Sequence, residues 1–540
     1  MPNLWLKLKE EIATKVGVDV NNVEYPKQAD LSVPCFKMGN PVEEARKLER
    51  KLQGKIKFIR EIKATGPFLN FFVDWGKFGG ELLKSVKKDY GSGKEKGKIM
   101  VEFAHPNTHK GFHIGHVRNI CIGESLSRIM EWQGNKIIRT NYQGDVGPHI
   151  SKVLWGLENL EMKPPSGTIE KAKWLGKVYA AANTKIKEDG KEGEIKKMTA
   201  NMYEGKLNKK TLKLWKDTRE WSLKYFDSVY KDFGVKYDRL YFESELTDLG
   251  REFSLKLLEK KIAKKSEGAI IVDLSKQDLG VVVLITKDNY VLYNAKELGL
   301  AKLEFKEFNP DRLIHVVAVP QTLFFKQLFE LEKHIDPSWS KRGFHLSYEM
   351  VDLKGEKMAS RLGNVILYDE LIERIVEKLK ERAKEKKTND KNIKKIAMAA
   401  LKYGMLKFDN NRKILFDWEA ALQVTGNTGP YLQYSYARAC SIGEKGGKGK
   451  IGKLENEKEI ELLKLLAKFP EAVERAGREL QPHYLATYLH NLAEGFNSYY
   501  QTVKVIGSKN EKAKLALVEK VKMVLGIGLG LLGIDVLEKM

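Results

Sequence analysis

The sequence has little cysteine and no long run of apolar residues. Its 540 residues include three cysteines, Cys35, Cys121 and Cys440, and no two of them form a CxxC pair. This spacing argues against a disulfide framework and a cysteine-based zinc site, and it fits a reducing cytosol. The longest apolar stretch, residues 523–534, contains four glycines and is too short to span a bilayer, so it predicts a packed terminal helix. Residues 1–15 mix charges and lack the apolar core of a signal peptide, so we expect a cytoplasmic protein with no membrane segment.

Acidic residues are in the minority. The chain has 95 Lys and Arg against 72 Asp and Glu, which gives a formal net charge of +23. An excess of this size favours a polyanionic partner, because binding to phosphates releases condensed counterions. A lysine-rich surface that serves solubility or heat tolerance has the same composition. Composition leaves both explanations open.

The pattern of apolar residues predicts several domains. A chain of this length holds roughly three or four domains. We expect an α/β fold in which a Rossmann-like, parallel-sheet catalytic domain with insertions lies between an N-terminal α+β domain and a C-terminal all-α helical bundle. The expected boundaries are 1–92, 93–367, 368–430 and 431–540, with insertions near 148–221 and 247–289. In the last region we expect separate helices over 458–469, 470–480 and 482–503.

A pair of histidines stands at the start of a predicted helix. A strand over 99–104, a helix over 113–133 and a strand over 136–141 form a strand–helix–strand unit. His113 and His116 lie on the first turn of this helix, where unpaired N–H groups and the helix dipole favour phosphate. Gly115 would let a flat base approach the backbone. Two metal ligands or two surface histidines are the alternatives, although no third ligand stands at the usual spacing.

A basic segment follows the predicted sheet. It contains Lys357, Ser360 and Arg361, within the sequence KMASR. Cations in a mobile loop can stabilise a pyrophosphate leaving group and then release it. Alone, the segment is an ordinary basic loop. Together with His113 and His116 it indicates activation of a substrate by ATP.

These two segments resemble the HIGH and KMSKS signatures of class I aminoacyl-tRNA synthetases, and their surroundings resemble arginyl-tRNA synthetases. The similarity extends over nearly the whole chain. It is carried by the stretch from Val101 to Arg118, and by NYQGDVG (141–147), GNTGPYLQYSYARACSI (426–442), ADLSVPCFKM (29–38) and GPFLNF (66–71).

The resemblance implies a two-step reaction and a set of site residues. Arginine would be activated by ATP, bound with Mg²⁺, to an adenylate and then transferred to the terminal ribose of tRNA(Arg); no permanently bound protein metal is implied. The implied catalytic residues are His113, His116, Lys357, Ser360 and Arg361, in the loop at 357–361 and at the helix start. The implied ATP-binding residues are Gly115, His116, Asn119, Met350, Val351 and Lys357. The implied arginine-binding residues are Glu102, Asn107, His113, Tyr293, Glu297 and Gln321.

The resemblance also implies how tRNA binds. The N-terminal domain would contact the tRNA elbow through Asn70. The helical domain would meet the anticodon, with Tyr431, Tyr434 and Arg438 among its contacts, because exposed bases stack on aromatic side chains. Some of these tyrosines are alternatively core residues of packed helices. We expect a monomer.

The sequence departs from the family pattern in three places. Glu297 stands where the family usually has Asp, next to Lys296 where Arg is common. The second Lys of KMSKS is absent, with Leu362 in place of a basic residue, and Leu537 replaces a proline common near the C-terminus. A class I synthetase for another amino acid, or a catalytically impaired tRNA-binding relative, therefore remains an alternative. A small nucleotidyltransferase is disfavoured because it would not need the helical C-terminal domain.

Overall fold

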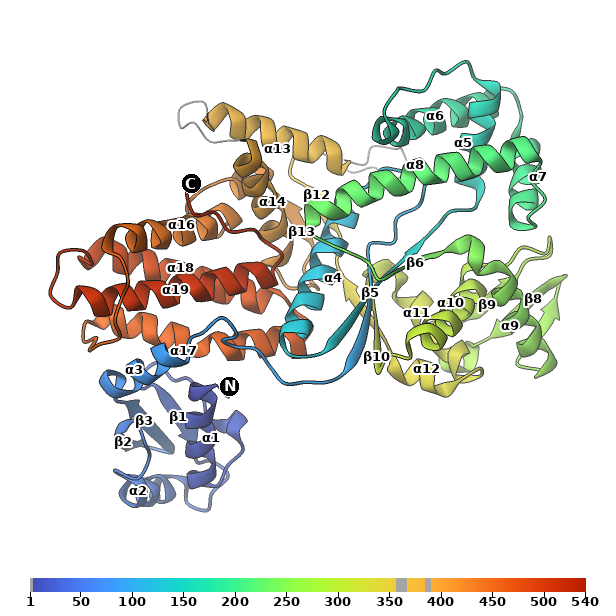
Figure 1. Ribbon diagram of the computed structural model, residues 1–540. Helices are drawn as coiled ribbons and strands as arrows, with labels where there is room; N and C mark the ends of the chain where they lie inside the picture. The colour runs from blue at the N-terminus through green and yellow to red at the C-terminus, as the bar shows by residue number, and fades with distance from the viewer. Residues whose placement is uncertain (1–2, 356–366, 384–389) are drawn as a thin grey trace. The chain divides into compact units, whose positions relative to one another are not determined.

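The chain folds into two compact units. The computed structural model describes residues 3–355, 367–383 and 390–540 (Figure 1). One unit is continuous in sequence, Glu95–Ala421, and the other joins Met1–Lys94 to Leu422–Met540. The two ends of the chain therefore fold together.

A five-stranded parallel sheet is the centre of the Glu95–Ala421 unit. Its order is β11-β10-β4-β5-β6. The strands are β4 (Lys98–Glu102), β5 (Lys136–Gln143), β6 (Arg239–Phe242), β10 (Arg312–Ala318) and β11 (Gly343–Tyr348). The chain runs from β4 to β5 and β6 on one side and adds β10 and β11 on the other, so the order reverses between β4 and β10. Ligands bind in the crevice at the carboxyl ends of strands beside such a reversal. The predicted Rossmann-like sheet is confirmed.

Helices cover this sheet. The first, α4 (Ile114–Trp132), contacts β4, β5 and β10 and is buried along most of its length, as expected for a helix packed on the inside of the unit. The others are α10 (Tyr293–Phe308), α11 (Thr322–Lys333) and α12 (Pro337–Arg342). The predicted helix over 113–133 is present, with His113 as the residue that caps it.

The first insertion is a group of four helices. They are α5 (Pro148–Asn159), α6 (Thr168–Glu188), α7 (Glu192–Tyr203) and α8 (Lys209–Phe233). Figure 1 shows α5, α6 and α7 gathered around one end of the long α8. This helix continues past residue 221 because the apolar stripe that includes Phe226 and Phe233 remains buried.

The second insertion begins with a helix and continues as a small sheet. After α9 (Thr247–Glu259), the strands β7 (Ala263–Ser266), β8 (Ala269–Asp273) and β9 (Val281–Ile285) form an antiparallel sheet. The helix was not anticipated from the strand-rich pattern. It packs tightly on α10. A Cβ at Gly250 would lie only 2.8 Å from the carbonyl carbon of Ala295, so glycine allows this close approach.

The last part of this unit carries short strands and helices. The strands β12 (Val351–Leu353) and β13 (Ile414–Phe416) pair in parallel. The helices are α13 (Tyr368–Ala383), α14 (Asp390–Leu406) and α15 (Trp418–Ala421).

The other unit combines an α+β segment with a helical bundle. Its sheet, in the order β1-β3-β2, is antiparallel. Its strands are β1 (Leu31–Pro34), β2 (Ile59–Thr65) and β3 (Phe68–Val73), and the helices near them are α1 (Leu4–Val16), α2 (Pro41–Leu52) and α3 (Trp75–Ser85). The bundle consists of α16 (Gly429–Gly446), α17 (Glu457–Arg478), α18 (His483–Thr502) and α19 (Glu511–Leu531). The predicted C-terminal all-α bundle is confirmed.

The prediction that a helix ends before Pro470 is wrong. Pro470 lies inside α17, which is continuous from Glu457 to Arg478. A proline inside a helix leaves the carbonyl of residue i−4 without its N–H partner. Here that carbonyl, on Leu466, accepts a hydrogen bond from the Tyr90 hydroxyl at 3.0 Å. Tyr90, 376 positions before Leu466, therefore satisfies the carbonyl that Pro470 frees, which sequence periodicity could not anticipate.

The glycine-interrupted apolar stretch lies mostly within α19, which packs against α16, α17 and α18. A Cβ at Gly528 would lie 2.4 Å from a Leu489 methyl group, so the glycine allows α19 and α18 to approach closely. Within the described residues, no helix has the length and apolar character that a membrane crossing needs.

Candidate active site

The histidine pair caps the N-terminus of α4. The His113 ring nitrogen Nδ1 accepts the Gly115 N–H at 3.1 Å, and His116 Nδ1 accepts the His113 N–H at 3.1 Å. The two rings lie 3.7 Å apart, centroid to centroid. Because each Nδ1 accepts from a backbone N–H, the proton of each neutral ring is on Nε2. Both histidines therefore present an Nε2–H donor.

Both histidines are neutral near pH 7. Burial and the nearby Lys110 ammonium lower the pKa of His113 to about 4. Burial, His113, His105 and Lys110 lower the pKa of His116 well below its usual value. An anion at this helix start would therefore meet neutral hydrogen-bond donors rather than imidazolium charge.

The structure gives a second reason for a glycine at position 115, besides the close approach of a base to the backbone. A Cβ at this position would lie 2.9 Å from His113 Cε1 and 3.0 Å from Nδ1. Any side chain would therefore displace the His113 ring from the cap. The glycine is needed for the geometry of the histidine pair.

Asn119 and Arg118 tie α4 to the segments around it. The Asn119 amide accepts from the Ala104 N–H and donates to the Val316 carbonyl at 2.6 Å and to Tyr348 Oη at 3.0 Å. Both its groups are therefore committed to the scaffold. The fully buried Arg118 guanidinium donates to five backbone carbonyls, those of Glu349, Met350, Asp409, Asn410 and Arg412.

The hydrogen bonds from Arg118 hold the segment that contains Met350 and Val351, two further predicted ATP contacts. The Met350 side chain is exposed, whereas Val351 is buried in β12. The predicted catalytic residues Lys357, Ser360 and Arg361 lie outside the described residues. Lys354 is described, and its ammonium pairs with Asp417 at 2.7 Å.

Glu102 ends β4 as a buried carboxylate held by two imidazoles. It is 2% exposed, contacts His315 Nδ1 across the register pair with β10, and lies 3.4 Å from His105 Nδ1. Burial alone would raise the pKa of Glu102, but the two imidazoles outweigh burial and lower it. Glu102 is therefore an ionised carboxylate at the carboxyl end of β4, beside the point where the strand order reverses.

Glu297 and Tyr293 lie on the first turns of α10, four residues apart and so on one face of the helix. Tyr293 is 61% exposed, while Glu297 is buried. Burial and the neighbouring carboxyls of Glu102, Glu332 and Glu243 raise the pKa of Glu297 well above its usual value. This shift favours the protonated form of Glu297, and a bound cation would favour its ionisation.

The remaining predicted arginine contacts, Asn107 and Gln321, are exposed. Asn107 bridges to Gly144 after β5, where a Cβ would lie 2.1 Å from Asn107 Oδ1, so Gly144 makes room for this amide. Gln321 ends the short 3₁₀ turn η4 (Val319–Gln321) after β10. Glu102 thus ends β4, Asn107 lies in the loop that follows it, and Gln321 follows the neighbouring strand β10.

Several residues of this region were missed from the sequence. His105, His315 and Lys110 have no motif of their own, and His315 reaches Glu102 only through the register of β10 with β4. The buried pair of Glu243 and Lys296, 2.6 Å apart, joins β6 to α10. Its members are 53 positions apart in sequence, and no pattern indicates the pairing. Among the described residues, no group of His, Cys, Asp and Glu is arranged to hold a metal ion.

Two more glutamates, Glu304 and Glu332, are buried near this site. Among the described residues, neither Glu304 oxygen has a hydrogen-bond partner, and Glu332 Oε2 has none. Burial raises the pKa of Glu332 to about 8, from an ordinary value of 4.5. The folded protein therefore holds a proton on Glu332 that the unfolded chain releases between pH 4.5 and 8.

Because only the folded protein keeps this proton, the free energy of unfolding falls as pH rises from 4.5 to about 8. The stabilising contribution is complete below pH 4.5 and is lost as pH rises through about 8. Glu332→Gln, which is neutral at every pH, should therefore raise Tm relative to the unmodified protein, with a difference that grows from pH 5 to pH 8.5. Thermal unfolding across this range checks it. An equal difference at both ends would show that Glu332 is ionised in the folded state.

The predicted tRNA contacts lie in the other unit. On α16, the Arg438 guanidinium stacks between the rings of Tyr434 and Tyr500, 4.6 Å from each centroid. It donates to Tyr434 Oη at 2.9 Å and to Asn497 Oδ1. Tyr431 lies beside His490, with centroids 5.9 Å apart. Asn70, in β3, is buried.

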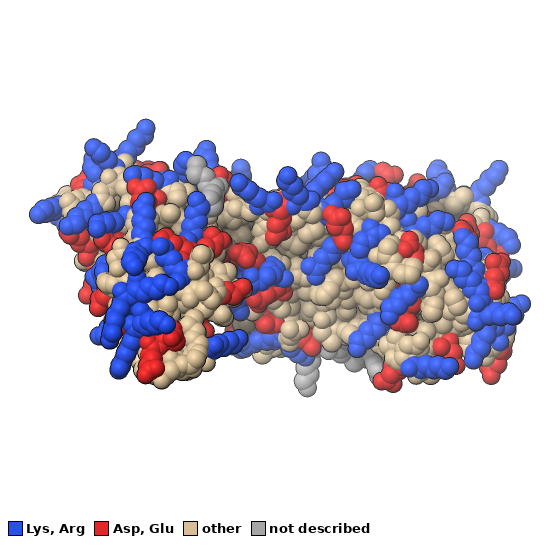
Figure 2. Space-filling model, turned by 90° about the horizontal axis from the view of Figure 1, so that it is seen from below, with Lys and Arg blue, Asp and Glu red and all other residues tan. Residues whose placement is uncertain are grey.

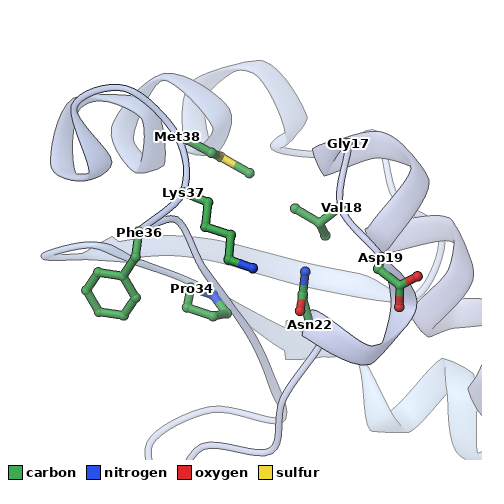
Figure 3. Close-up of a pocket in the computed structure, with 8 residues that line it drawn as sticks. All are labelled: Gly17, Val18, Asp19, Asn22, Pro34, Phe36, Lys37 and Met38. Atoms are coloured by element: carbon green, nitrogen blue, oxygen red, sulfur yellow. The ribbon is translucent and has the colours of Figure 1, made fainter.

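A pocket of about 360 Å³ opens in the N-terminal segment, beside an exposed aromatic pair. It is lined by Gly17, Val18, Asp19, Asn22, Pro34, Phe36, Lys37 and Met38. Figure 3 shows the Lys37 ammonium and the Asn22 amide pointing into it. Phe36 is 62% exposed and meets Phe68 edge to face at 5.3 Å. Phe68 is two residues before Asn70 in β3, and so on the same side of the strand.

Comparison with known proteins gives consistent matches. Residues 80–418 match the family of class I (R) tRNA synthetase catalytic domains, and residues 432–540 match the DALR anticodon binding domain. The arginine–tRNA ligase of Bdellovibrio bacteriovorus is 33% identical, covering 95% of this chain and 92% of the relative. That of Treponema denticola is 34% identical, covering 97% and 95%. The solved arginyl-tRNA synthetase of Thermus thermophilus shares the fold, with a TM-score of 0.84, 24% identity and complete coverage of both chains.

Proposed function

The chain belongs to the arginyl-tRNA synthetase family of class I tRNA synthetases, and we propose on this basis that it ligates L-arginine to tRNA(Arg). In the first step the arginine carboxylate attacks the α-phosphorus of ATP, and the bond to pyrophosphate breaks. In the second, a ribose hydroxyl of the tRNA terminus attacks the adenylate carbonyl and releases AMP. The activity uses ATP with Mg²⁺ as a substrate complex.

One observation supports the proposal most directly. The ionised carboxylate of Glu102 and the neutral Nε2–H donors of His113 and His116 lie on one continuous strand, loop and helix. Glu102 ends β4, and His113 caps α4 eleven residues later. A guanidinium is a rigid fork of donors that carboxylates bind bidentately. The imidazole N–H groups would bind phosphate oxygens as charge develops on them. The protein's task is alignment and charge stabilisation, so no general base is assigned.

The arginine site would combine Glu102, Glu297, Asn107, Tyr293 and Gln321. With Glu102 already ionised, arriving arginine would ionise Glu297, and the two carboxylates would share the guanidinium. Such a site rejects apolar amino acids strongly, because its buried acceptors would otherwise remain unpaired.

The ATP side would use Gly115, His116 and the Met350 segment, with Asn119 holding the scaffold behind them. The Lys110 ammonium is a further cation near both histidines. Lys357, Ser360 and Arg361 would stabilise the pyrophosphate from the basic loop.

The tRNA contacts would lie on the other unit. The tyrosine-stacked Arg438 on α16, with Tyr431 and Tyr434, offers aromatic and cationic surface to anticodon bases. At the N-terminal segment, the exposed Phe36 ring and Lys37 beside the pocket would receive an unstacked base and its phosphate near Asn70. Figure 2 shows many Lys and Arg side chains on the surface, interspersed with Asp and Glu, and the net charge of +23 suits a phosphate backbone. We further propose that the protein acts as a cytoplasmic monomer.

Isotope exchange between ATP and pyrophosphate tests this function. We expect exchange that requires both arginine and tRNA(Arg). Exchange driven by a different amino acid would reassign the substrate. The absence of exchange and of aminoacylation, with tRNA binding retained, would show a binding protein that has lost catalysis.

A further inference from the structure

A buried ion pair stands next to the residues proposed to bind arginine. Lys296 and Glu243 are 2% and 3% exposed, and the Lys296 ammonium donates to Glu243 Oε1 at 2.6 Å. Removing two charges from water costs about as much as their attraction returns, so such a pair contributes little net stability. Its presence calls for a role other than stability.

The pair joins elements that border the site. Glu243 begins the 3₁₀ turn η2 (Glu243–Glu245) at the carboxyl end of β6, and Lys296 lies on the first turn of α10. Lys296 directly precedes Glu297 and follows Tyr293 by three residues. Its ammonium lies 6.0 Å from the Tyr293 ring centroid. Any shift of Lys296 would therefore move both proposed arginine contacts.

The insertion reaches the same pair. Tyr203 ends α7, and its ring centroid lies 4.3 Å from the Lys296 ammonium, within the range of a cation–π interaction. The residue that follows Glu243 is anchored as well. Ser244 donates its N–H and its hydroxyl to the Asp145 carboxylate, at 2.8 and 2.7 Å. Asp145 in turn lies 3.3 Å from Arg219 on α8. The pair is thus held from both ends by the helices of the insertion.

We propose that Lys296 and Glu243 are positioning residues of the arginine site, and that Tyr203 of the insertion holds Lys296 in place through its ring. The pair neutralises a carboxylate that would otherwise compete for the substrate guanidinium, and it sets the first turn of α10 so that Glu297 and Tyr293 face arginine. This inference rests on the proposed function and assigns the insertion a part in amino-acid binding.

The test compares Lys296→Met with Lys296→Arg. The methionine keeps the length of the side chain and removes the charge, whereas arginine restores the pair with Glu243. In tRNA-dependent exchange, Lys296→Met should raise KM for arginine by about tenfold or more and change KM for ATP by less than about twofold. Lys296→Arg should return KM for arginine to within about threefold of the unmodified enzyme. Lys302→Met, on the same helix but paired with Glu252 and partly exposed, is the matched control and should change neither constant.

The Tyr203 ring supplies a second test that leaves the ion pair chemically intact. Tyr203→Phe keeps the ring and should behave as the unmodified enzyme, whereas Tyr203→Leu should raise KM for arginine alone. Parallel changes of both KM values with a lowered Tm would reduce the pair to a structural role and overturn the inference. If the unmodified enzyme shows no arginine-dependent exchange, the proposed function fails, and calorimetric titration of arginine into the same variants still decides whether the pair positions the site.

Discussion

Glu102→Gln is expected to lower arginine-dependent exchange by about a hundredfold or more. The glutamine keeps the shape of the side chain but removes a carboxylate that two imidazoles hold ionised in the unliganded site. Leaving one member of a buried charge pair alone costs about 3–5 kcal/mol, and each 1.36 kcal/mol is a factor of ten in rate. The loss should fall mainly on kcat/KM for arginine, because the guanidinium then meets only Glu297.

Glu332→Gln is the matched control for this change. It is the same substitution, in another buried glutamate near the site, but Glu332 lies on α11 and is not among the proposed substrate contacts. We expect exchange close to that of the unmodified enzyme. If Glu102→Gln retains activity within about threefold, the guanidinium is not bound by Glu102, and Glu297 becomes the principal acceptor.

His116→Asn and His116→Gln should separate the two tasks of this histidine. An asparagine oxygen can take the place of Nδ1 and accept the His113 N–H, but it offers no donor where Nε2 lies. A glutamine amide can reach the position of Nε2 but leaves the His113 N–H without its acceptor. We expect His116→Asn to lower kcat by about 10²–10³-fold with an almost unchanged Tm, because a donor to developing charge is lost.

His116→Gln should do the reverse, with more of kcat retained and Tm lowered by the loss of a cap worth about 1 kcal/mol. Steady-state kinetics and thermal unfolding of both variants check the pair of outcomes. An active His116→Asn would show that the histidine serves the cap alone. Since burial holds the pKa of His113 at about 4 and that of His116 well below its usual value, kcat should show no titration near pH 6.5 in the unmodified enzyme.

Local chemistry predicted the parts of the site that lie together in the chain. A strand, a glycine-containing loop and a helix start place Glu102, His113 and His116 within fifteen residues. The helix dipole and the free N–H groups of its first turn act over the same short distance. The sequence could not show that both Nδ1 atoms face inward as caps, because that depends on the rotamers that the packed rings adopt.

Local sequence did not predict the contacts between segments that are distant in the chain. Pro470 is a helix breaker in every local description, yet α17 passes through it, because Tyr90 supplies the missing hydrogen bond. Similarly, His315 reaches Glu102 through strand register, and Lys296 reaches Glu243 across 53 residues. Each contact depends on how β4, β6, β10 and α10 are placed around the sheet, which periodicity along a single element does not specify.

The sequence by itself therefore determined the architecture and the family and predicted the residues of the site, because helix starts, apolar periodicity and motif spacing are local properties. The tertiary structure alone decided the state of those residues. Burial and neighbouring charges lower the pKa values of Glu102 and His113 and raise that of Glu297, and those neighbours come together only when the chain has folded.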